Sequence, residues 1–316
     1  MISSRTCLPT LLITAAGTGM GWAYALALAQ QFPDVRLITA DINAKPWVSA
    51  ALMAEHHVRW PLFSPGEVYL DRLNALIREH AITHYLPIID PEIAFAAHHV
   101  NSIEAKVIAV DASFSDMASG KKDYELALRP LGIATPGTLS RQDVEGGAKA
   151  YAKLSGGFGG RAVWLVDDRE KLKDLPADVY LQEAIDGSEF TADCFPTNDA
   201  DIVFCSVRER IETKSGVCTK ARIMPHPVME EYAKRLVQNF RISHPFCFQA
   251  IGKDRLVVTD INPRLGGGTM MSVANGSDFF GAHLAQSFGY SWRDRLKRHH
   301  QSCAITRQYI ELVAAE

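Results

Sequence analysis

LVVTDINPRLGGG, residues 256–268, is the most informative stretch of this sequence. It runs from an apolar strand into an acid, an amide and an arginine at alternate positions, and then into three glycines. Side chains of an extended segment point alternately to its two faces, so Asp260, Asn262 and Arg264 share one side. We therefore expect three polar groups to converge at the end of this strand. A strand end with an Asx turn and a solvent-exposed arginine is the alternative.

The composition is that of an ordinary soluble globular protein. The chain has 316 residues, of which 47% are hydrophobic and 22% charged, a length typical of about two domains. A formal net charge of -3 gives no electrostatic reason to expect nucleic acid, which requires a basic surface. The six cysteines lack the paired spacing of zinc ligands, so we interpret them as reduced cytosolic thiols.

The first third of the chain alternates between short apolar segments and helical ones. TLLITAA (10–16), VRLITAD (35–41) and KVIAV (106–110) predict strands, and GWAYALALAQQF (21–32) predicts a helix. THYLPII with the following PEIAFAAHHV (83–100) repeats the pairing of a strand with a helix. This alternation indicates a parallel sheet wrapped by helices, as in a Rossmann-like domain.

The N-terminal residues have two interpretations. Arg5 and the apolar run after it imitate a secretory leader, but GTGMG (17–21) interrupts that run with turn-forming glycines. We therefore expect a cytoplasmic protein that keeps this segment. No stretch of 18 or more uninterrupted apolar residues predicts a membrane span.

The second part of the chain is richer in predicted strands. Long β-rich stretches follow the cluster of Ser, Asp and Gly around residue 118, and helices are fewer, chiefly VMEEYAKRLVQNF (228–240) and DFFGAHLAQSFG (278–289). We place the boundary there. The prediction is an N-terminal Rossmann-like domain at 1–118 and a second, mixed α+β domain at 119–316.

Two glycine loops are candidate phosphate sites. AAGTGMG (15–21) follows a predicted strand and opens a helix, so its glycines would let the backbone approach an anion, and Asp41 lies where a ribose-binding acid would. The spacing is G-x-G-x-G, however, and a tight strand-to-helix turn needs glycine for steric reasons alone. KLSGGFGGRAVWLV (153–166) lies between two predicted strands, and its amides could fold over phosphates with Lys153 and Arg161 nearby. A surface hairpin is the alternative.

Five motifs in one order resemble the ATP-grasp superfamily, in the branch that includes the large chain of carbamoyl phosphate synthetase and other carboxylate-amine ligases. In chain order these motifs are GKKDYELALRPLGIATPGT (120–138), KLSGGFGGR (153–161), YLQEAIDGSEFTADCF (180–195), VRERIETKSG (207–216) and FQAIGKDRLVVTDINPRLGGG (248–268). The resemblance implies a pre-ATP-grasp domain followed by a two-lobed ATP-grasp domain. Its nucleotide-covering lobe would span 119–187 and its catalytic lobe 188–316.

The resemblance assigns a nucleotide site to the first three motifs. Two lysines and a closing loop would contact the ATP phosphates. The start of the third motif would lie beside the adenine, and an acid further along that motif would accept from the ribose hydroxyls. The residues so implied are Lys122, Lys153, Ser155, Gly156, Gly157, Gly160, Gln182, Glu183, Ile185 and Glu189. Glu189 as a solvated strand residue and Gln182 as a sheet-edge residue are the alternatives.

The same resemblance assigns a metal site to the last motif. Gln249, Asp260 and Asn262 would supply oxygen ligands to Mg2+, and Arg264 would stabilise charge on the transferring phosphoryl group. The acid here is Asp where a longer Glu is common, and Gln249 is uncharged, so the number of metal ions stays open.

Substrate contacts are expected on other polar residues. Arg208 and Arg210 share a strand face and, with Lys220, are candidates to clamp the acceptor carboxylate, although the same arrangement fits a solvated surface. Asp90 and Glu92 follow a predicted strand at the end where open α/β sheets place ligand groups. A helix N-cap is the alternative for Asp90.

The resemblance implies an ATP- and Mg2+-dependent ligase that activates a small-molecule carboxylate as an acylphosphate for attack by an amine. Its expected partners are small molecules, with no nucleic acid and no membrane, and a homodimer is an expectation from the superfamily. Two alternatives remain: a nicotinamide-dependent oxidoreductase built on the AAGTGMG loop, and an ATP-binding protein without turnover.

Overall fold

The computed structural model describes residues 8–120, 124–154, 163–176, 179–197, 203–253, 255–298 and 300–314. The chain forms two compact units. The first unit comprises Met1–Ser115, Pro263–Lys297 and Tyr309–Glu316, and the second comprises Asp116–Asn262 and Arg298–Gln308.

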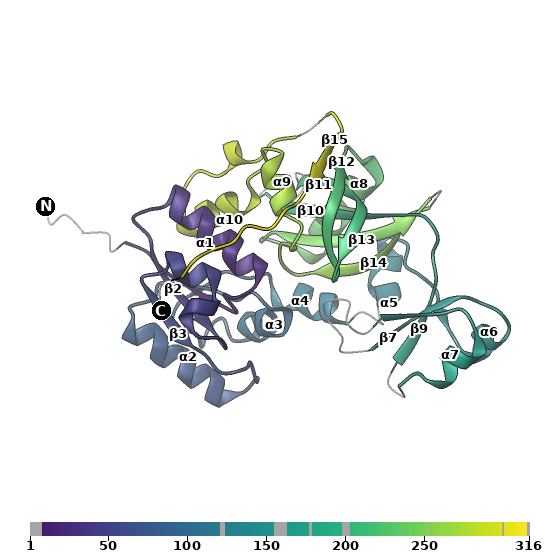
Figure 1. The fold of residues 1–316 in the computed structure, drawn as a ribbon, viewed down its shortest axis with the longest axis horizontal. Helices are drawn as coiled ribbons and strands as arrows, with labels where there is room; N and C mark the ends of the chain where they lie inside the picture. The colour runs from purple at the N-terminus through teal and green to yellow at the C-terminus, as the bar shows by residue number, and fades with distance from the viewer. Residues whose placement is uncertain are drawn as a thin grey trace, which may run out of the picture. The chain divides into compact units, whose positions relative to one another are not determined.

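A five-stranded parallel sheet forms the centre of the first unit, in the order β3-β2-β1-β4-β5. Figure 1 labels two of its strands, β2 and β3. All five residues of the central strand β1 are buried, as expected where helices cover both faces of a sheet. Leu12, Ile38 and Tyr85 of three strands pack in one cluster with Leu73 and Phe95 of the helices. The strands are β1 (Thr10–Thr14), β2 (Arg36–Asp41), β3 (His56–Arg59), β4 (His84–Leu86) and β5 (Lys106–Val107).

The helices of the first unit come from both ends of the chain. They are α1 (Gly19–Gln31), α2 (Glu67–Glu79), α3 (Asp90–His98), α9 (Met270–Ala274) and α10 (Phe279–Phe288), while α4 (Ala112–Ser119) crosses the boundary between the units; short 3-10 helices lie at Lys45–Trp47, Ser49–Met53 and Arg293–Arg295.

Helix α10 packs against α1 through aromatic side chains. The rings of Tyr24 and Phe280 meet edge to face with centroids 4.8 Å apart, and the Tyr24 hydroxyl lies 2.7 Å from Nδ1 of His283. These buried contacts join residues 263–297 to the first unit. The two units therefore differ from the predicted domains 1–118 and 119–316. The difference arises because the hydrophobic face of α10 packs against α1 rather than against the strands that precede it in the chain.

The second unit contains two antiparallel sheets. The smaller is four-stranded, in the order β6-β9-β7-β8, and the larger is six-stranded, in the order β14-β13-β10-β11-β12-β15. The smaller sheet comprises β6 (Thr138–Leu139), β7 (Ala150–Leu154), β8 (Val163–Val166) and β9 (Val179–Glu183), with helices α5 (Tyr124–Leu128), α6 (Arg141–Glu145) and α7 (Arg169–Lys173) and a 3-10 helix at Arg129–Leu131. The larger comprises β10 (Ser188–Pro196), β11 (Val203–Lys214), β12 (Val217–Ile223), β13 (Phe246–Gly252), β14 (Val257–Asn262) and β15 (Cys303–Thr306), with α8 (Pro227–Phe240).

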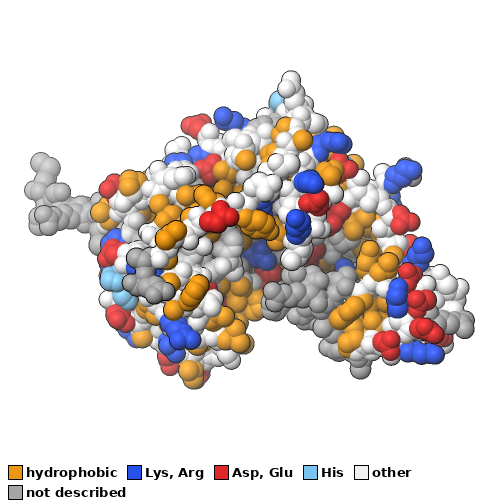
Figure 2. All heavy atoms as spheres, viewed as in Figure 1, with side chains coloured by type: hydrophobic (Ala, Val, Ile, Leu, Met, Phe, Trp, Pro, Cys, Tyr) orange, Lys and Arg blue, Asp and Glu red, His pale blue; other side chains and the backbone are white. Residues whose placement is uncertain are grey.

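Helices cover one face of each sheet in the second unit. Ala150, Ala152 and Leu181 of the smaller sheet pack with Val144 of α6 and Leu172 of α7. The outer surface over α6 and α7 carries interspersed acidic and basic side chains (Figure 2), among them the pair of Lys171 and Asp167 at 2.5 Å. The other face of this sheet is therefore the one that can line a binding site.

The predicted fold class is confirmed: a helix-flanked parallel sheet precedes two β-rich lobes. Over the described ranges, no helix combines the length and the apolar character needed to cross a membrane.

Candidate active site

One face of the six-stranded sheet is polar. The antiparallel register places Gln249 opposite Asp260, Thr191 opposite Gln249, and Arg208 opposite Thr191. Directly opposed residues point to the same side of a sheet, so strands β14, β13, β10 and β11 present these groups together. Alternation along each strand adds further polar residues to this face, namely Glu189, Asp193, Ser206, Arg210 and Asn262.

The opposite face of the same sheet is apolar. Phe190, Ala192, Phe248 and Ile261 are buried there, and α8 packs against β10 and β11. The burial of this face under α8 explains why the polar face is turned the other way. The sequence prediction of one shared side holds for Asp260 and Asn262, whereas Arg264 lies beyond the end of β14.

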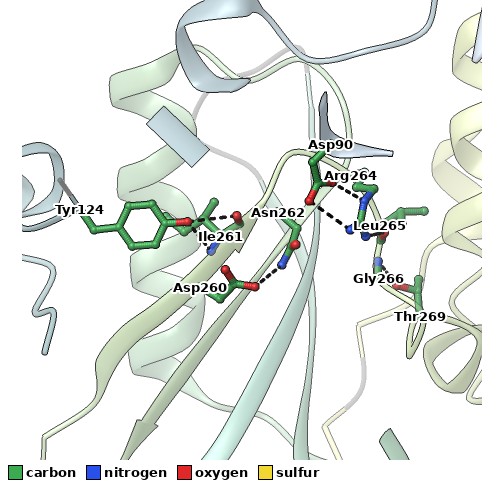
Figure 3. Close-up of polar contacts among 9 residues, drawn as sticks. All are labelled: Asp90, Tyr124, Asp260, Ile261, Asn262, Arg264, Leu265, Gly266 and Thr269. Atoms are coloured by element: carbon green, nitrogen blue, oxygen red, sulfur yellow. Dashed lines mark hydrogen bonds and ion pairs between the residues drawn. The ribbon is translucent and has the colours of Figure 1, made fainter. Parts of the chain in front are cut away.

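The end of β14 is fixed from both of its sides. On the polar face, Nδ2 of Asn262 donates to Oδ2 of Asp260 at 2.9 Å (Figure 3). The buried Tyr124 hydroxyl accepts from the Ile261 amide at 3.0 Å and contacts the Ile261 carbonyl at 3.2 Å. Tyr124 thus holds the backbone between the two predicted metal ligands. Sequence reasoning gave this residue no role, because only the fold brings α5 beside β14.

The face of the smaller sheet that is not covered by α6 and α7 is directed at β14. Nζ of Lys153 lies 3.5 Å from the carbonyl oxygen of Thr259, the residue before Asp260. Tyr180 stands directly opposite Lys153 in the sheet. Burial and the negative charge of Asp260 raise the pKa of Tyr180 to about 12. Lys153 and Asp260 are therefore brought together from separate lobes.

Several buried polar atoms on these two facing surfaces have no hydrogen-bond partner within the described part of the chain. They are the Tyr180 hydroxyl, Oε1 of Gln182, Oγ of Ser206, Nε of Arg208 and Nε of Arg210. A buried polar atom without a partner costs about 1–3 kcal/mol. A polar ligand between the sheets would satisfy such groups, so the donor set fits a molecule such as a nucleotide.

Arg208 is held by a buried carboxylate. Its guanidinium forms an ion pair with Asp193, and the two side chains are 3% and 0% exposed. Burial opposes the charged form, but the Asp193 carboxylate keeps the pKa of Arg208 above its usual range. Arg208 therefore presents almost no surface to a substrate, which differs from the predicted clamp.

Arg210 and Glu189 contact each other on the same face. Nη1 of Arg210 lies 2.9 Å from Oε1 of Glu189, and its Nη2 donates to the Gly216 carbonyl at 2.9 Å. Glu189 is 33% exposed at its side chain, whereas Arg210 is 7% exposed. The residue predicted to bind ribose and the residue predicted to bind the acceptor are thus neighbours. Lys220 lies away from them, paired with Glu212 at an exposed site.

The segment between β9 and β10 connects the two sheets. The amide of Glu183 donates to the Gly137 carbonyl at 2.8 Å, and the half-buried Ile185 follows. Gln182 is buried on the face shared with Lys153, but Glu183 points to the other face because strand residues alternate. At the end of this segment, a Cβ on Gly187 would lie 2.3 Å from the backbone of Gly252, and φ is +141°, so only glycine fits.

Arg264 lies in the first unit, after the chain leaves β14. Its Nε donates to Oδ1 of Asp90 at 2.5 Å, its Nη2 lies 3.3 Å from Oδ2, and its Nη1 donates to the Leu265 carbonyl at 3.1 Å (Figure 3). Asp90 is the first residue of α3, and Ile89 occupies the N-cap position. The alternative prediction that Asp90 caps this helix is therefore wrong, because its carboxylate binds an arginine instead.

Comparisons with known proteins agree with this geometry. Residues 176–308 match the family described as ATP-grasp in the biosynthetic pathway with Ter operon. The biotin carboxylase domain of the 2-oxoglutarate carboxylase of Hydrogenobacter thermophilus has a similar fold, with a TM-score of 0.74 and 12% identity over 93% of this chain and 73% of that chain. The chain has the fold of this structure, and its residues 176–308 match an ATP-grasp family.

Two further structures share the fold of this chain. N5-carboxyaminoimidazole ribonucleotide synthetase from Thermotoga maritima gives a TM-score of 0.69 at 16% identity, over 91% of this chain and 78% of that chain. An L-amino acid ligase from Bacillus licheniformis gives 0.69 at 17% identity, over 88% and 74%. No curated protein matches the chain in sequence.

Part of the predicted nucleotide site lies outside the described residues. That part comprises Lys122 and the loop residues Ser155, Gly156, Gly157 and Gly160. Their predicted roles stay predictions.

The candidate metal ligands include a single carboxylate. Among the described side chains, no three His, Cys, Asp or Glu residues gather as a metal-binding group. Gln249 and Asp260 are cross-strand partners, and Asn262 bonds Asp260, so two amides flank one acid. This set suits a hard cation that keeps phosphate oxygens and waters as its remaining ligands.

The N-terminal glycine loop is explained by packing. Oδ2 of Asp41 accepts from the Gly17 amide at 2.7 Å, and a Cβ on Gly21 would lie 2.4 Å from the carbonyl oxygen of Ala16. Thr18 caps α1 by accepting from the Gly21 amide at 3.1 Å. Asp41 is therefore engaged with the loop itself, as the steric interpretation of these glycines predicts, and not set aside for a ribose.

Proposed function

We propose that this chain is an ATP- and Mg2+-dependent ligase that activates a small-molecule carboxylate as an acylphosphate for attack by an amine. The observation that carries the proposal is the meeting of two polar sheet faces in the second unit, with Lys153 on one and Asp260 on the other. The similar structures support it. One was solved with MgADP and bicarbonate, another with a β-γ-ATP compound, and others are named as a synthetase and an amino acid ligase.

We assign the nucleotide to the space between the sheets. Lys153, with Lys122 and the loop 155–160, would neutralise phosphate charge, and Gln182 with the backbone near Ile185 would lie beside the adenine. Glu189 would accept from the ribose hydroxyls. Glu183 would contribute through its backbone, since its side chain points to the other face of β9.

We assign the metal to the end of β14. Asp260 and the amide oxygens of Asn262 and Gln249 would hold Mg2+, which supplies charge neutralisation to the phosphate oxygens. The hydrogen bond between Asn262 and Asp260 keeps both side chains at this end of the strand. Tyr124 fixes their backbone through Ile261.

We assign charge stabilisation to arginines. Arg264 would stabilise the phosphoryl group as it transfers, because a preorganised guanidinium is most effective where charge develops. Arg210 would bind the acceptor carboxylate beside Glu189. Arg208 would act through its buried Nε rather than as a charged clamp, because Asp193 neutralises its guanidinium.

We further propose that the protein acts in the cytoplasm as a homodimer on small molecules. The described cysteines Cys194, Cys205, Cys218, Cys247 and Cys303 are free thiols, which suits a reducing compartment. One structure of similar fold is a dimer of biotin carboxylase domains.

The test is ADP formation by the purified chain with ATP, Mg2+ and pooled amino acids. We expect ADP from the wild type and none from Asp260→Asn, which keeps the shape of the side chain but removes the metal-binding charge. Glu212→Gln, at an exposed ion pair on the same sheet, is the matched control and should be active. ATP binding without ADP would indicate a protein without turnover. Binding of NADH but not of ATP would favour an oxidoreductase.

A further inference from the structure

A buried hydrogen-bond network fixes the first turn of α3. The hydroxyls of Tyr69 and Tyr85 both donate to Oε1 of Glu92, the second at 2.7 Å, and Nε1 of Trp60 donates to the Tyr69 hydroxyl at 3.1 Å. Glu92 is 2% exposed. These contacts join α3 to β4 and α2, so the start of the helix has one position in the first unit.

Asp90 stands two residues before Glu92 at the start of the same helix. Its carboxylate lies at the helix N-terminus, where the backbone dipole favours a negative charge. Both of its oxygens face the guanidinium of Arg264, at 2.5 Å and 3.3 Å. The side chains of Arg264 and Asp90 are 25% and 18% exposed, so the ion pair is partly buried and still accessible to solvent.

The loop that carries Arg264 is held by contacts of its own. The Gly266 amide donates to Oγ1 of Thr269 at 3.0 Å, and the Thr269 amide donates to the Gly266 carbonyl at 3.0 Å. Leu265 is fully buried. The backbone of this loop is therefore fixed without Asp90, whereas the long side chain of Arg264 depends on a partner for its direction.

We propose that Asp90 is a positioning residue that sets the direction and plane of the Arg264 guanidinium. Two oxygens on two nitrogens fix both features, which a single contact does not. The inference rests on the proposed function, in which Arg264 stabilises the transferring phosphoryl group. Within the first unit, α3 and the Glu92 network support the pair.

The test compares Asp90→Asn, Asp90→Glu, Arg264→Gln and the double variant Asp90→Asn/Arg264→Gln in the full chain. The readouts are kcat, the KM for ATP and the thermal unfolding midpoint. Glu104→Gln is the matched control, because it removes the carboxylate of an exposed ion pair with Arg78 in the same unit.

We expect Asp90→Asn to lower kcat by about 10- to 100-fold, the usual effect of a misdirected catalytic group, with an unchanged KM for ATP. Asp90→Glu should recover part of the rate, since it keeps the charge. The double variant should be no slower than Arg264→Gln alone, because Asp90 acts only through Arg264. A kcat of Asp90→Asn within twofold of the control, or losses that multiply in the double variant, would overturn the proposal.

The unfolding midpoints separate failure of this inference from failure of the proposed function. If the wild type forms no ADP, the ligase assignment fails, but the four midpoints still report whether the two side chains interact. If the midpoint shift of the double variant is smaller than the sum of the two single shifts, the side chains of Asp90 and Arg264 interact. Additive shifts show that Asp90 does not hold Arg264, and they overturn the positioning role whatever the activity.

Discussion

Replacement of Asp193 by alanine should strongly destabilise the second unit. The change leaves the Arg208 guanidinium buried at 2% exposure without its carboxylate partner, in a sheet whose other face is packed under α8. Removing one partner of a buried ion pair costs about 3–5 kcal/mol, because the remaining charge stays desolvated. For a unit of this size, each kcal/mol lowers the unfolding midpoint by roughly 2–4 °C, so we expect a drop of about 6–20 °C.

The assay is thermal unfolding followed by circular dichroism, with Glu212→Ala as control. Glu212 pairs with Lys220 at an exposed position, where an ion pair contributes about 1 kcal/mol or less, so the control should shift the midpoint by no more than about 4 °C. Asp193→Leu combined with Arg208→Met should recover most of the loss, because it removes both charges. Equal shifts for Asp193→Ala and the control would refute the reasoning.

Three further predictions concern other parts of the chain. Gly21→Ala should cost about 1–3 kcal/mol, because its Cβ would lie 2.4 Å from the Ala16 carbonyl, whereas Gly19→Ala, with nothing within 4 Å, should be neutral or stabilising in the same unfolding assay. Burial raises the pKa of Glu92, so the stability that its carboxyl contributes is present at low pH and is lost as pH rises through the folded pKa. The unfolding midpoint of Glu92→Gln should therefore gain on that of the wild type as pH rises from the ordinary glutamate pKa of about 4.5 toward the raised pKa of the folded state. Over that range the free energy of unfolding of the wild type should fall by up to about 1.4 kcal/mol per pH unit relative to the variant, and a widening loss for the variant at high pH would contradict this. Tyr180→Phe removes a buried hydroxyl without a described partner, so it should weaken ATP binding by about 2- to 10-fold in calorimetry and leave the ligand-free unfolding midpoint nearly unchanged.

Local patterns were sufficient to predict the strands and the polar side of β14. Period-two alternation placed Asp260 and Asn262 on one face, and it also placed Arg208 and Arg210 together on β11. Both expectations depend only on strand geometry, which the sequence specifies directly. The order of five motifs then indicated the superfamily, in agreement with the family match of residues 176–308 and with the fold.

Contacts between distant segments were beyond such patterns. Asp193 meets Arg208 because of the register between two strands, and Asp90 meets Arg264 across 174 positions of the chain. The return of residues 263–297 to the first unit depends on which helix accepts the aromatic face of α10. No local preference encodes these choices, because they follow from the packing of whole elements.

The N-terminal glycine loop is another feature whose use the sequence alone did not determine. Its glycines were compatible with a dinucleotide or with a steep turn, since both uses need a residue without a side chain. Only the position of the Asp41 carboxylate, bonded to the Gly17 amide at 2.7 Å, favours the turn. A motif of this kind becomes informative when the partner of its acid is known.

The most direct test of a nucleotide held between the two sheets is calorimetric titration with ATP, with and without Mg2+, of the wild type and of Asp260→Asn. We predict that Mg2+ tightens ATP binding to the wild type, and that the variant keeps the Mg2+-free affinity but loses this gain. An absence of ATP binding to the wild type, or an equal Mg2+ response in the variant, would contradict the account.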